Sequence, residues 1–130
     1  MTAVLLDTHA LLWWLVDDPS LPSQAKHVIA DTNTTILVSA ASAMEITTKY
    51  RLGKLPYAGR LATSFISVVA GEGFELLSIS VPHAVFAGNL EISHKDPFDR
   101  LLIAQSILDS VSLVGNERLF DGFGVSRIWT

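Results

Sequence analysis

Short apolar runs alternate with segments of helical periodicity along the whole chain. The runs are rich in Val, Ile and Leu, as buried strands are, and they span residues 3–6, 34–39, 74–80, 111–115 and 125–129. Helical patterns fill the intervals at 8–16, 21–32, 40–55, 57–73, 82–90 and 96–110, and a short helix or turn is expected at 116–123. This alternation predicts an α/β fold in three layers, with a central, mostly parallel sheet of about five strands and helices on both faces.

Capping residues mark the starts of two predicted helices. Pro22 and Ser23 lie near the start of the second helix, where Ser23 is a candidate N-cap. The best-marked helix begins in "DPFDR", where Asp96 can act as the cap, Pro97 can fill the first position and Asp99 lies in the first turn. Capping alone would therefore account for both aspartates.

The composition narrows the class of protein. With 130 residues, 49% of them hydrophobic, the chain can bury a core as one domain spanning 1–130. The absence of cysteine excludes disulfides, thiolate metal sites and cysteine nucleophiles. The longest apolar run, "ALLWWLV" at 10–16, is too short to cross a bilayer, and the first Lys or Arg is Lys26. We therefore expect a cytoplasmic protein without a membrane partner.

The acidic balance of the chain limits how it could bind nucleic acid. The formal net charge is −4. A protein that binds nucleic acid by covering many phosphates should instead be basic. Any contact with nucleic acid is therefore expected to be local or bridged by metal cations.

Polar side chains gather where predicted strands end and helices begin. In an open α/β sheet, ligand sites lie beyond the carboxyl ends of the strands. The residues at these junctions are Asp7, Thr8 and His9 after 3–6, Ser39 and Glu45 after 34–39, Asp96 and Asp99 before 111–115, and Asn116 and Glu117 after it. Several carboxylates are therefore expected along one edge of the sheet.

Each of these residues also has a purely structural interpretation. Asp7 can cap the helix that follows the first strand. Glu45 can pair with Lys49 at i,i+4, or form a capping box with Ser42. The polar residues after the fourth strand can be ordinary turn and surface residues.

A divalent cation explains the whole set better than these separate interpretations do. Converging carboxylates repel each other, which raises their pKa values and destabilises the empty fold. Oxygen ligands without cysteine or a paired-histidine motif suit Mg²⁺ or Mn²⁺ rather than zinc. Such a metal would also supply the attraction for a polyanion that the protein surface lacks.

Four sequence blocks together resemble PIN-domain ribonucleases, and in particular the VapC-type toxins of toxin–antitoxin pairs. The blocks are "LLDTHALLWW", "SAASAMEI", "HKDPFDRLLIAQS" and "LVGNERLFDGFGVSRIW", and they occur in the family's order across essentially the full chain. The resemblance implies a PIN-like α/β/α fold and hydrolysis of RNA phosphodiester bonds with Mg²⁺ or Mn²⁺ as the cofactor.

The resemblance also assigns the metal-site carboxylates by position. It makes Asp7 the first, Glu45 the second and Asp99 the third. The small residues Ala104 and Ser106 follow Asp99 at the family's spacing.

At two positions the chain extends or departs from the family pattern. Asp96 resembles the additional aspartate of the "DPFDR" branch and is expected to cap its helix and support the site. The fourth family acid lies after the "LV" strand in a T-x-D pattern, where this chain reads "GNE". Gly115 then stands for the threonine, and either Asn116, the better match by register, or Glu117 stands for the aspartate. This departure bears on whether a second metal ion is bound and on full activity.

Partners are implied in the same way. Thr8, Lys95, Arg100 and Glu117 are expected to contact the RNA substrate, with Lys95 and Arg100 facing phosphate or, in the inhibited state, acidic groups. An antitoxin protein would insert a basic side chain into the acidic pocket, and two copies of the chain would form a homodimer. Candidate interface residues, which their helical spacing also allows in the core, are Trp13, Trp14 and Phe65.

Two other classes remain open. A receiver-type signalling domain would also gather carboxylates around Mg²⁺, but it needs adjacent acids after the first strand and an acid ending the third, where this chain has "LLDTH" and "LLSIS". A PIN-like binding module that has lost catalysis is motivated by Asn116. A nucleotide-binding enzyme is disfavoured, because the chain has no P-loop and "GEGF" at 71–74 precedes a strand instead of opening a helix.

Overall fold

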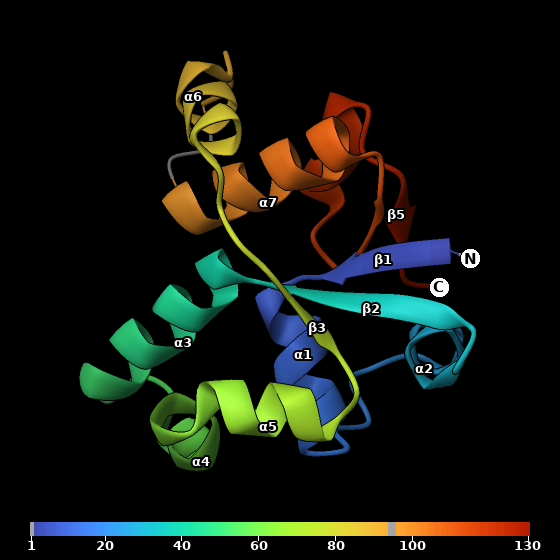
Figure 1. Cartoon of the computed structure of the whole chain (residues 1–130), viewed down its shortest axis with the longest axis vertical. Helices are drawn as coiled ribbons and strands as arrows, with labels where there is room; N and C mark the ends of the chain where they lie inside the picture. The colour runs from blue at the N-terminus through green and yellow to red at the C-terminus, as the bar shows by residue number, and fades with distance from the viewer. Residues whose placement is uncertain (1, 94–95) are drawn as a thin grey trace.

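The computed structural model describes residues 2–93 and 96–130, and its centre is a sheet of five parallel strands (Figure 1). The strands are β1 (Thr2–Leu6), β2 (Thr34–Ser39), β3 (Glu75–Leu77), β4 (Ser112–Val114) and β5 (Arg127–Ile128). Neighbouring strands in the order β3-β2-β1-β4-β5 all run parallel. The predicted α/β fold with a central parallel sheet is therefore confirmed.

The strand order rules out the receiver alternative. Flavodoxin-like doubly wound sheets, the type that receiver domains have, follow the order 2-1-3-4-5. This sheet follows the order 3-2-1-4-5. The receiver interpretation of the sequence is therefore wrong.

Helices cover both faces of the sheet. They are α1 (Thr8–Leu15), α2 (Ser23–Ala30), α3 (Ala40–Arg51), α4 (Gly59–Thr63), α5 (Phe65–Gly71), α6 (Val81–Asn89) and α7 (Pro97–Asp109), with 3-10 turns η1 (Pro56–Ala58) and η2 (Arg118–Phe123). In Figure 1, α6 and α7 lie on one side of the sheet, and α1, α4 and α5 lie on the other. None of the described helices is long and apolar enough to cross a membrane.

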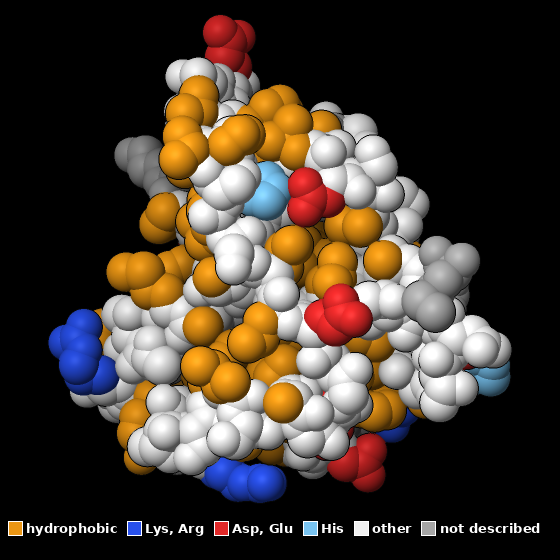
Figure 2. All heavy atoms as spheres, in the orientation of Figure 1, with side chains coloured by type: hydrophobic (Ala, Val, Ile, Leu, Met, Phe, Trp, Pro, Cys, Tyr) orange, Lys and Arg blue, Asp and Glu red, His pale blue; other side chains and the backbone are white. Residues whose placement is uncertain are grey.

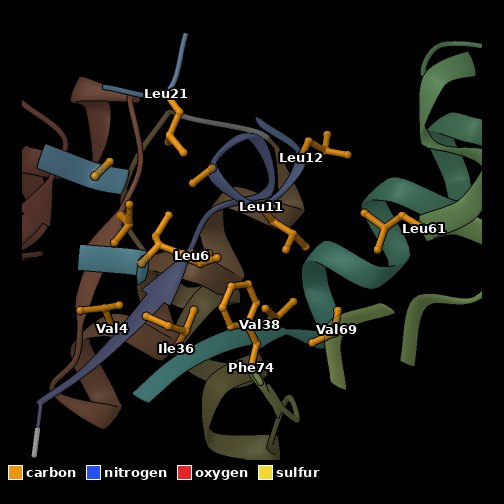
Figure 3. Close-up of a cluster of buried hydrophobic side chains, with 14 of the residues drawn as sticks. Val4, Leu6, Leu11, Leu12, Leu21, Ile36, Val38, Leu61, Val69 and Phe74 are labelled. Atoms are coloured by element: carbon orange, nitrogen blue, oxygen red, sulfur yellow. The ribbon is translucent and has the colours of Figure 1, made fainter. Parts of the chain in front are cut away.

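Successive strand residues point to opposite faces and fill two separate cores. Val4 and Leu6 pack with residues of α1 and α5, whereas Leu5 packs with residues of α7. Figure 3 shows the first of these cores, in which Phe74 lies beside Val38 of β2. Because both faces of the sheet are buried around its central strands, β1, β2 and β4 appear in the sequence as continuous apolar runs.

Two predicted helix boundaries are wrong. The expected helix at 57–73 begins in the 3-10 turn η1 and is broken at Ser64 (φ −137°, ψ 40°) into α4 and α5. The Thr63 hydroxyl donates to a carbonyl oxygen one turn earlier at 2.8 Å, a side-chain bond of the kind that bends helices. In α2, Ser23 is already the first helical residue, and the cap position is held by Pro22, which makes no side-chain capping bond.

The carboxyl ends of β1, β2 and β4 form the edge that carries the candidate site. Asp7 follows β1, and Gly115 follows β4. At the end of β2, the Ser39 hydroxyl caps α3 by accepting from the Ala41 N–H (2.9 Å) and donates to Gln105 of α7 (2.6 Å). In Figure 1, α3 and α7 both begin on this side of the sheet, so three strands and two helices deliver polar groups to one edge.

Candidate active site

Asp7 is a buried carboxylate at the junction of β1 and α1. Its backbone N–H donates to the Val114 carbonyl at the end of β4 (2.9 Å). Its Oδ1 caps α1 by accepting from the Ala10 N–H (2.7 Å). Only 5% of the residue is exposed. The structural interpretation of Asp7 as a cap is therefore correct, but a cap does not require burial of this degree.

Burial raises the pKa of Asp7 from 3.8 to about 7. The hydrogen bond from Ala10 opposes the rise, while the negative charges of Asp99, Glu45 and Glu117 add to it. Acids from α3, from α7 and from the loop after β4 thus act on one buried carboxyl group. The structure therefore brings together the acids that the sequence places at this edge.

Glu45 lies in the second turn of α3, and both of its carboxylate oxygens have partners. The Thr8 hydroxyl donates to Oε1 (2.6 Å) and the Lys49 ammonium donates to Oε2 (2.6 Å). The Ser42 hydroxyl lies 3.0 Å from Thr8 Oγ1. Since the single hydroxyl proton of Thr8 is used on Glu45, Ser42 is the donor to Thr8. These bonds hold the carboxylate in one orientation.

Two expectations for this part of the site change. The i,i+4 ion pair between Glu45 and Lys49 forms, but the capping box with Ser42 does not, because Ser39 is the cap of α3. Thr8, expected to contact substrate, is buried and bonded to Glu45. Thr8 is therefore better described as a residue that positions Glu45.

Asp96 and Asp99 lie at the start of α7. Asp96 Oδ1 accepts from the N–H groups of Phe98 (2.9 Å) and Asp99 (3.3 Å), and Pro97 is the first helical residue. Asp99 is half-buried in the first turn, and its charge acts on Asp7. Asp96 thus fixes the start of the helix that carries Asp99, and the capping and site interpretations of "DPFDR" are compatible.

The loop after β4 is held by a basic side chain from β5. Arg127 donates to the Gly115 carbonyl (3.0 Å) and forms a bidentate ion pair with Asp121 (2.7 and 3.0 Å). Asn116 and Glu117 are exposed in this loop. Glu117, and not the neutral Asn116, adds charge to the buried carboxyl at the β1–α1 junction.

Gly115 packs directly against Asp7. A Cβ atom on Gly115 would lie 2.8 Å from Asp7 Cγ and closer still to Oδ2. Position 115 therefore has no room for a side chain while Asp7 keeps its present orientation. The threonine of the family pattern would require the Asp7 carboxylate to move.

Arg100 has a different role from the expected one. Its guanidinium donates to the carbonyl oxygens of Ala87 (3.0 Å), Gly88 (3.2 Å), Leu90 (2.7 Å) and Ile92 (3.4 Å). These bonds tie the first turn of α7 to the end of α6. The predicted contact with RNA phosphate does not fit, because the N–H groups of this side chain already have backbone partners.

Replacing Arg100 with Lys is expected to lower the free energy of unfolding by about 1 to 3 kcal/mol. Lysine keeps the positive charge, but its ammonium group cannot reach all of the carbonyl oxygens that the planar guanidinium of Arg100 contacts. Urea denaturation measures the loss, with Arg51→Lys at the exposed end of α3 as a control that should stay within about 0.5 kcal/mol of wild type. Unchanged stability together with weaker RNA binding would restore the phosphate role.

Two predictions, the phosphate contact of Lys95 and the homodimer, are not tested by the geometry of the site. His94 and Lys95 lie outside the described residues, so the phosphate contact of Lys95 stays a prediction. Trp13, Trp14 and Phe65 are half-buried against the core, and the Trp14 indole donates to Glu72 (2.7 Å). This is what the core interpretation expects, and the homodimer stays a prediction.

The donor set suits a hard divalent cation that keeps much of its water. Asp7, Glu45 and Asp99 offer carboxylate oxygens, the ligands that Mg²⁺ and Mn²⁺ prefer. Among residues 2–93 and 96–130, no three His, Cys, Asp or Glu side chains form a ready-made metal cluster. Mg²⁺ does not need one, since it binds through one or two carboxylates together with waters and substrate phosphates. The residues therefore fit an open, partly hydrated metal site.

Sequence reasoning predicted the pair of Lys49 with Glu45, but it missed the bond of Ser42 to Thr8 and the supporting role of Arg127. Ser42 and Lys49 lie three residues before and four residues after Glu45, so helical spacing already places them on its face. Arg127 had no comparable signal, because its partners come from other segments of the chain.

Comparisons with known proteins extend this description. The PIN domain family model matches residues 4–123. No curated protein sequence matches the chain. Among solved structures, VapBC2 from Rickettsia felis bound to a promoter DNA fragment superposes with a TM-score of 0.68 at 16% identity, covering 97% of each chain. FitAcB from Neisseria gonorrhoeae gives 0.62 at 17% identity, covering 95% of each chain.

A toxin–antitoxin complex from Klebsiella pneumoniae gives a TM-score of 0.60 at 17% identity and covers 93% of this chain and 92% of that one. Identities this low speak only for a shared fold. The match to the family model shows more than the fold, because the matched residues 4–123 include the acids Asp7, Glu45 and Asp99. On this evidence, the chain belongs to the PIN domain family.

Proposed function

We propose that this protein is a metal-dependent endoribonuclease that acts as the toxin of a toxin–antitoxin pair. The observation that carries the proposal is the convergence of Asp99, Glu45 and Glu117 on the buried Asp7. Four acids at one sheet edge are costly to the empty fold and useful to a cation-dependent phosphodiesterase. The PIN domain match across residues 4–123 supports the same chemistry.

Asp7, Glu45 and Asp99 are proposed to hold Mg²⁺ or Mn²⁺, directly or through water. The ion would stabilise charge on the phosphate and lower the pKa of an attacking water. Thr8 and Ser42 keep the Glu45 carboxylate oriented, and burial keeps Asp7 away from competing solvent. The chain's own residues thus contribute prearranged negative charge, which water alone cannot supply.

An antitoxin partner is supported by the structural relatives. The R. felis and N. gonorrhoeae proteins and the K. pneumoniae complex were solved as VapBC2, FitAcB and a toxin–antitoxin complex, respectively. We propose that a cognate antitoxin binds this chain and covers the acidic edge with a basic side chain. We also keep the predictions that the chain acts as one domain, forms a homodimer and works in the cytoplasm.

The test of the activity is cleavage of total cellular RNA by purified protein with Mg²⁺, with Mn²⁺ and with excess EDTA. We expect discrete fragments with either metal and none with EDTA. The Asp99→Asn variant should lose cleavage, because it removes one of the proposed ligands while keeping the helix start that Asp96 caps. Asp109→Asn, at the exposed far end of the same helix, is the matched control and should cut RNA normally.

A catalytically impaired PIN-like binding module is the second candidate. It is favoured by "GNE" at 115–117, where the resemblance places a threonine and an aspartate. Folded, antitoxin-free protein that binds RNA but leaves it uncut with both metals would support this module over the nuclease. Cleavage that is unaffected by both EDTA and Asp99→Asn would contradict the metal site itself.

A further inference from the structure

We propose that the Lys49 ammonium binds an RNA phosphate beside the acidic edge, and this inference rests on the proposed ribonuclease function. Lys49 lies one helical turn beyond Glu45 on α3, and its Nζ donates to Glu45 Oε2 (2.6 Å). Its side chain remains 36% exposed, whereas that of Glu45 is 6% exposed. The ammonium therefore lies between a buried acid and solvent.

The surroundings of Lys49 differ from those of an ordinary surface ion pair. Partial burial acts to lower its pKa, yet the hydrogen bond and charge of Glu45, with the charges of Asp96 and Asp99, raise the pKa above its usual value. An exposed i,i+4 pair involves one acid and contributes little to stability. Lys49 instead lies within reach of acids from two helices, so its charge belongs to the site.

A phosphate needs positive charge at this point. An RNA backbone that approaches Asp7 and Asp99 meets like charge, and the protein as a whole carries a net charge of −4. On the face seen in Figure 2, Lys and Arg side chains lie as isolated groups near the margins, without a continuous basic patch among the described residues. With a net charge of −4 and no basic patch on this face, individual cations close to the site are expected to supply the attraction for RNA.

Two other described cations near the site, Arg100 and Arg127, are bonded to other groups. The guanidinium of Arg100 is bonded to backbone carbonyls at the end of α6, and that of Arg127 to Asp121 and Gly115. Lys49 has three N–H donors, and within the described part of the chain its one hydrogen bond is to Glu45. A lysine on a flexible stem can keep this bond and offer its remaining donors to phosphate as a point charge.

The experiment measures RNA binding without cleavage. Wild-type and Lys49→Met proteins are compared in an Asp99→Asn background, with a fluorescein-labelled single-stranded RNA of mixed sequence and a series of salt concentrations. Loss of one phosphate contact on single-stranded RNA should reduce the slope of log Kd against log salt by about 0.7 and weaken binding about ten-fold. Lys49→Arg should restore most of the slope, because it returns the charge.

Two further measurements distinguish phosphate binding by Lys49 from a role of Lys49 in positioning Glu45. Lys26→Met, on α2 at the other end of the sheet, removes an equally charged residue and should leave slope and affinity unchanged. In the cleavage-competent background, Lys49→Gln should raise KM far more than it lowers kcat. An unchanged salt slope, with the loss confined to kcat, would overturn the proposal and leave Lys49 as a positioning residue for Glu45. Protein that neither binds nor cuts RNA in any form would instead contradict the ribonuclease function.

Discussion

Without metal, the Asp7→Asn protein is expected to be more stable than wild type at about pH 8, by roughly 4 kcal/mol. With Mg²⁺ present, it is expected to have lost RNA cleavage. Asparagine keeps a side-chain oxygen for the bond from Ala10, so α1 retains its cap. It removes the one charge that the fold buries against three other acids. Stability and activity should therefore change in opposite directions.

The direction of this change in stability follows from the raised pKa of Asp7. Asp7 has a pKa of 3.8 in the reference state and about 7 in the folded protein, so between these values the folded protein binds the additional proton. The stability linked to this proton is fully present below about pH 4 and is lost progressively as the pH rises to about 7. Above about pH 7, the loss of stability caused by the ionised Asp7 stays constant. The stability curves of variant and wild type should therefore converge in acid and separate towards neutral pH.

Urea denaturation in EDTA across this pH range measures the effect. Asp17→Asn is the matched control, because Asp17 has a positive φ that Asn tolerates and its side chain is 93% exposed. The control should follow wild type throughout. Adding Mg²⁺ should recover stability in wild type near pH 8 but not in Asp7→Asn, since an ion that binds only the folded state stabilises it. Parallel curves for Asp7→Asn and wild type would contradict the burial of a charged Asp7.

Gly115→Ala is expected to reduce cleavage at least ten-fold and to lower the free energy of unfolding by about 1 to 3 kcal/mol. The added methyl group would overlap the Asp7 carboxylate, with its Cβ 2.8 Å from Cγ. Asp7 must then rotate, which weakens its bond to Ala10 and moves a proposed metal ligand. One methyl group outside the acid set should thus disable the site.

Gly71→Ala controls for the general effect of replacing a glycine. A Cβ on Gly71, at the end of α5, would meet no atom within 4 Å, so this variant should keep full activity and stability. Cleavage rates under saturating Mg²⁺ and thermal unfolding of both variants provide the comparison. Full activity in Gly115→Ala would mean that the Asp7 orientation described above is not the one used in catalysis.

Much of the fold followed from local patterns in the sequence. The apolar runs at 3–6 and 34–39 correspond to β1 and β2, because strands buried on both faces carry few polar residues. Parallel strands send their carboxyl ends to one edge, so the placement of Asp7 and Asp99 at that edge could be predicted without coordinates. The N-cap role of Asp96 could also be predicted, because a cap depends only on residues close to it in sequence.

Only the tertiary structure decided how the side chains at that edge are used. Arg100 was assigned to phosphate, but its partners are carbonyl groups of another helix. Thr8 and Glu45 are 37 residues apart in sequence and bonded in space. The contact between Gly115 and Asp7 likewise depends on the pairing of β1 with β4. Sequence periodicity specifies which face a residue lies on, whereas its hydrogen-bond partner and its burial depend on how distant segments pack.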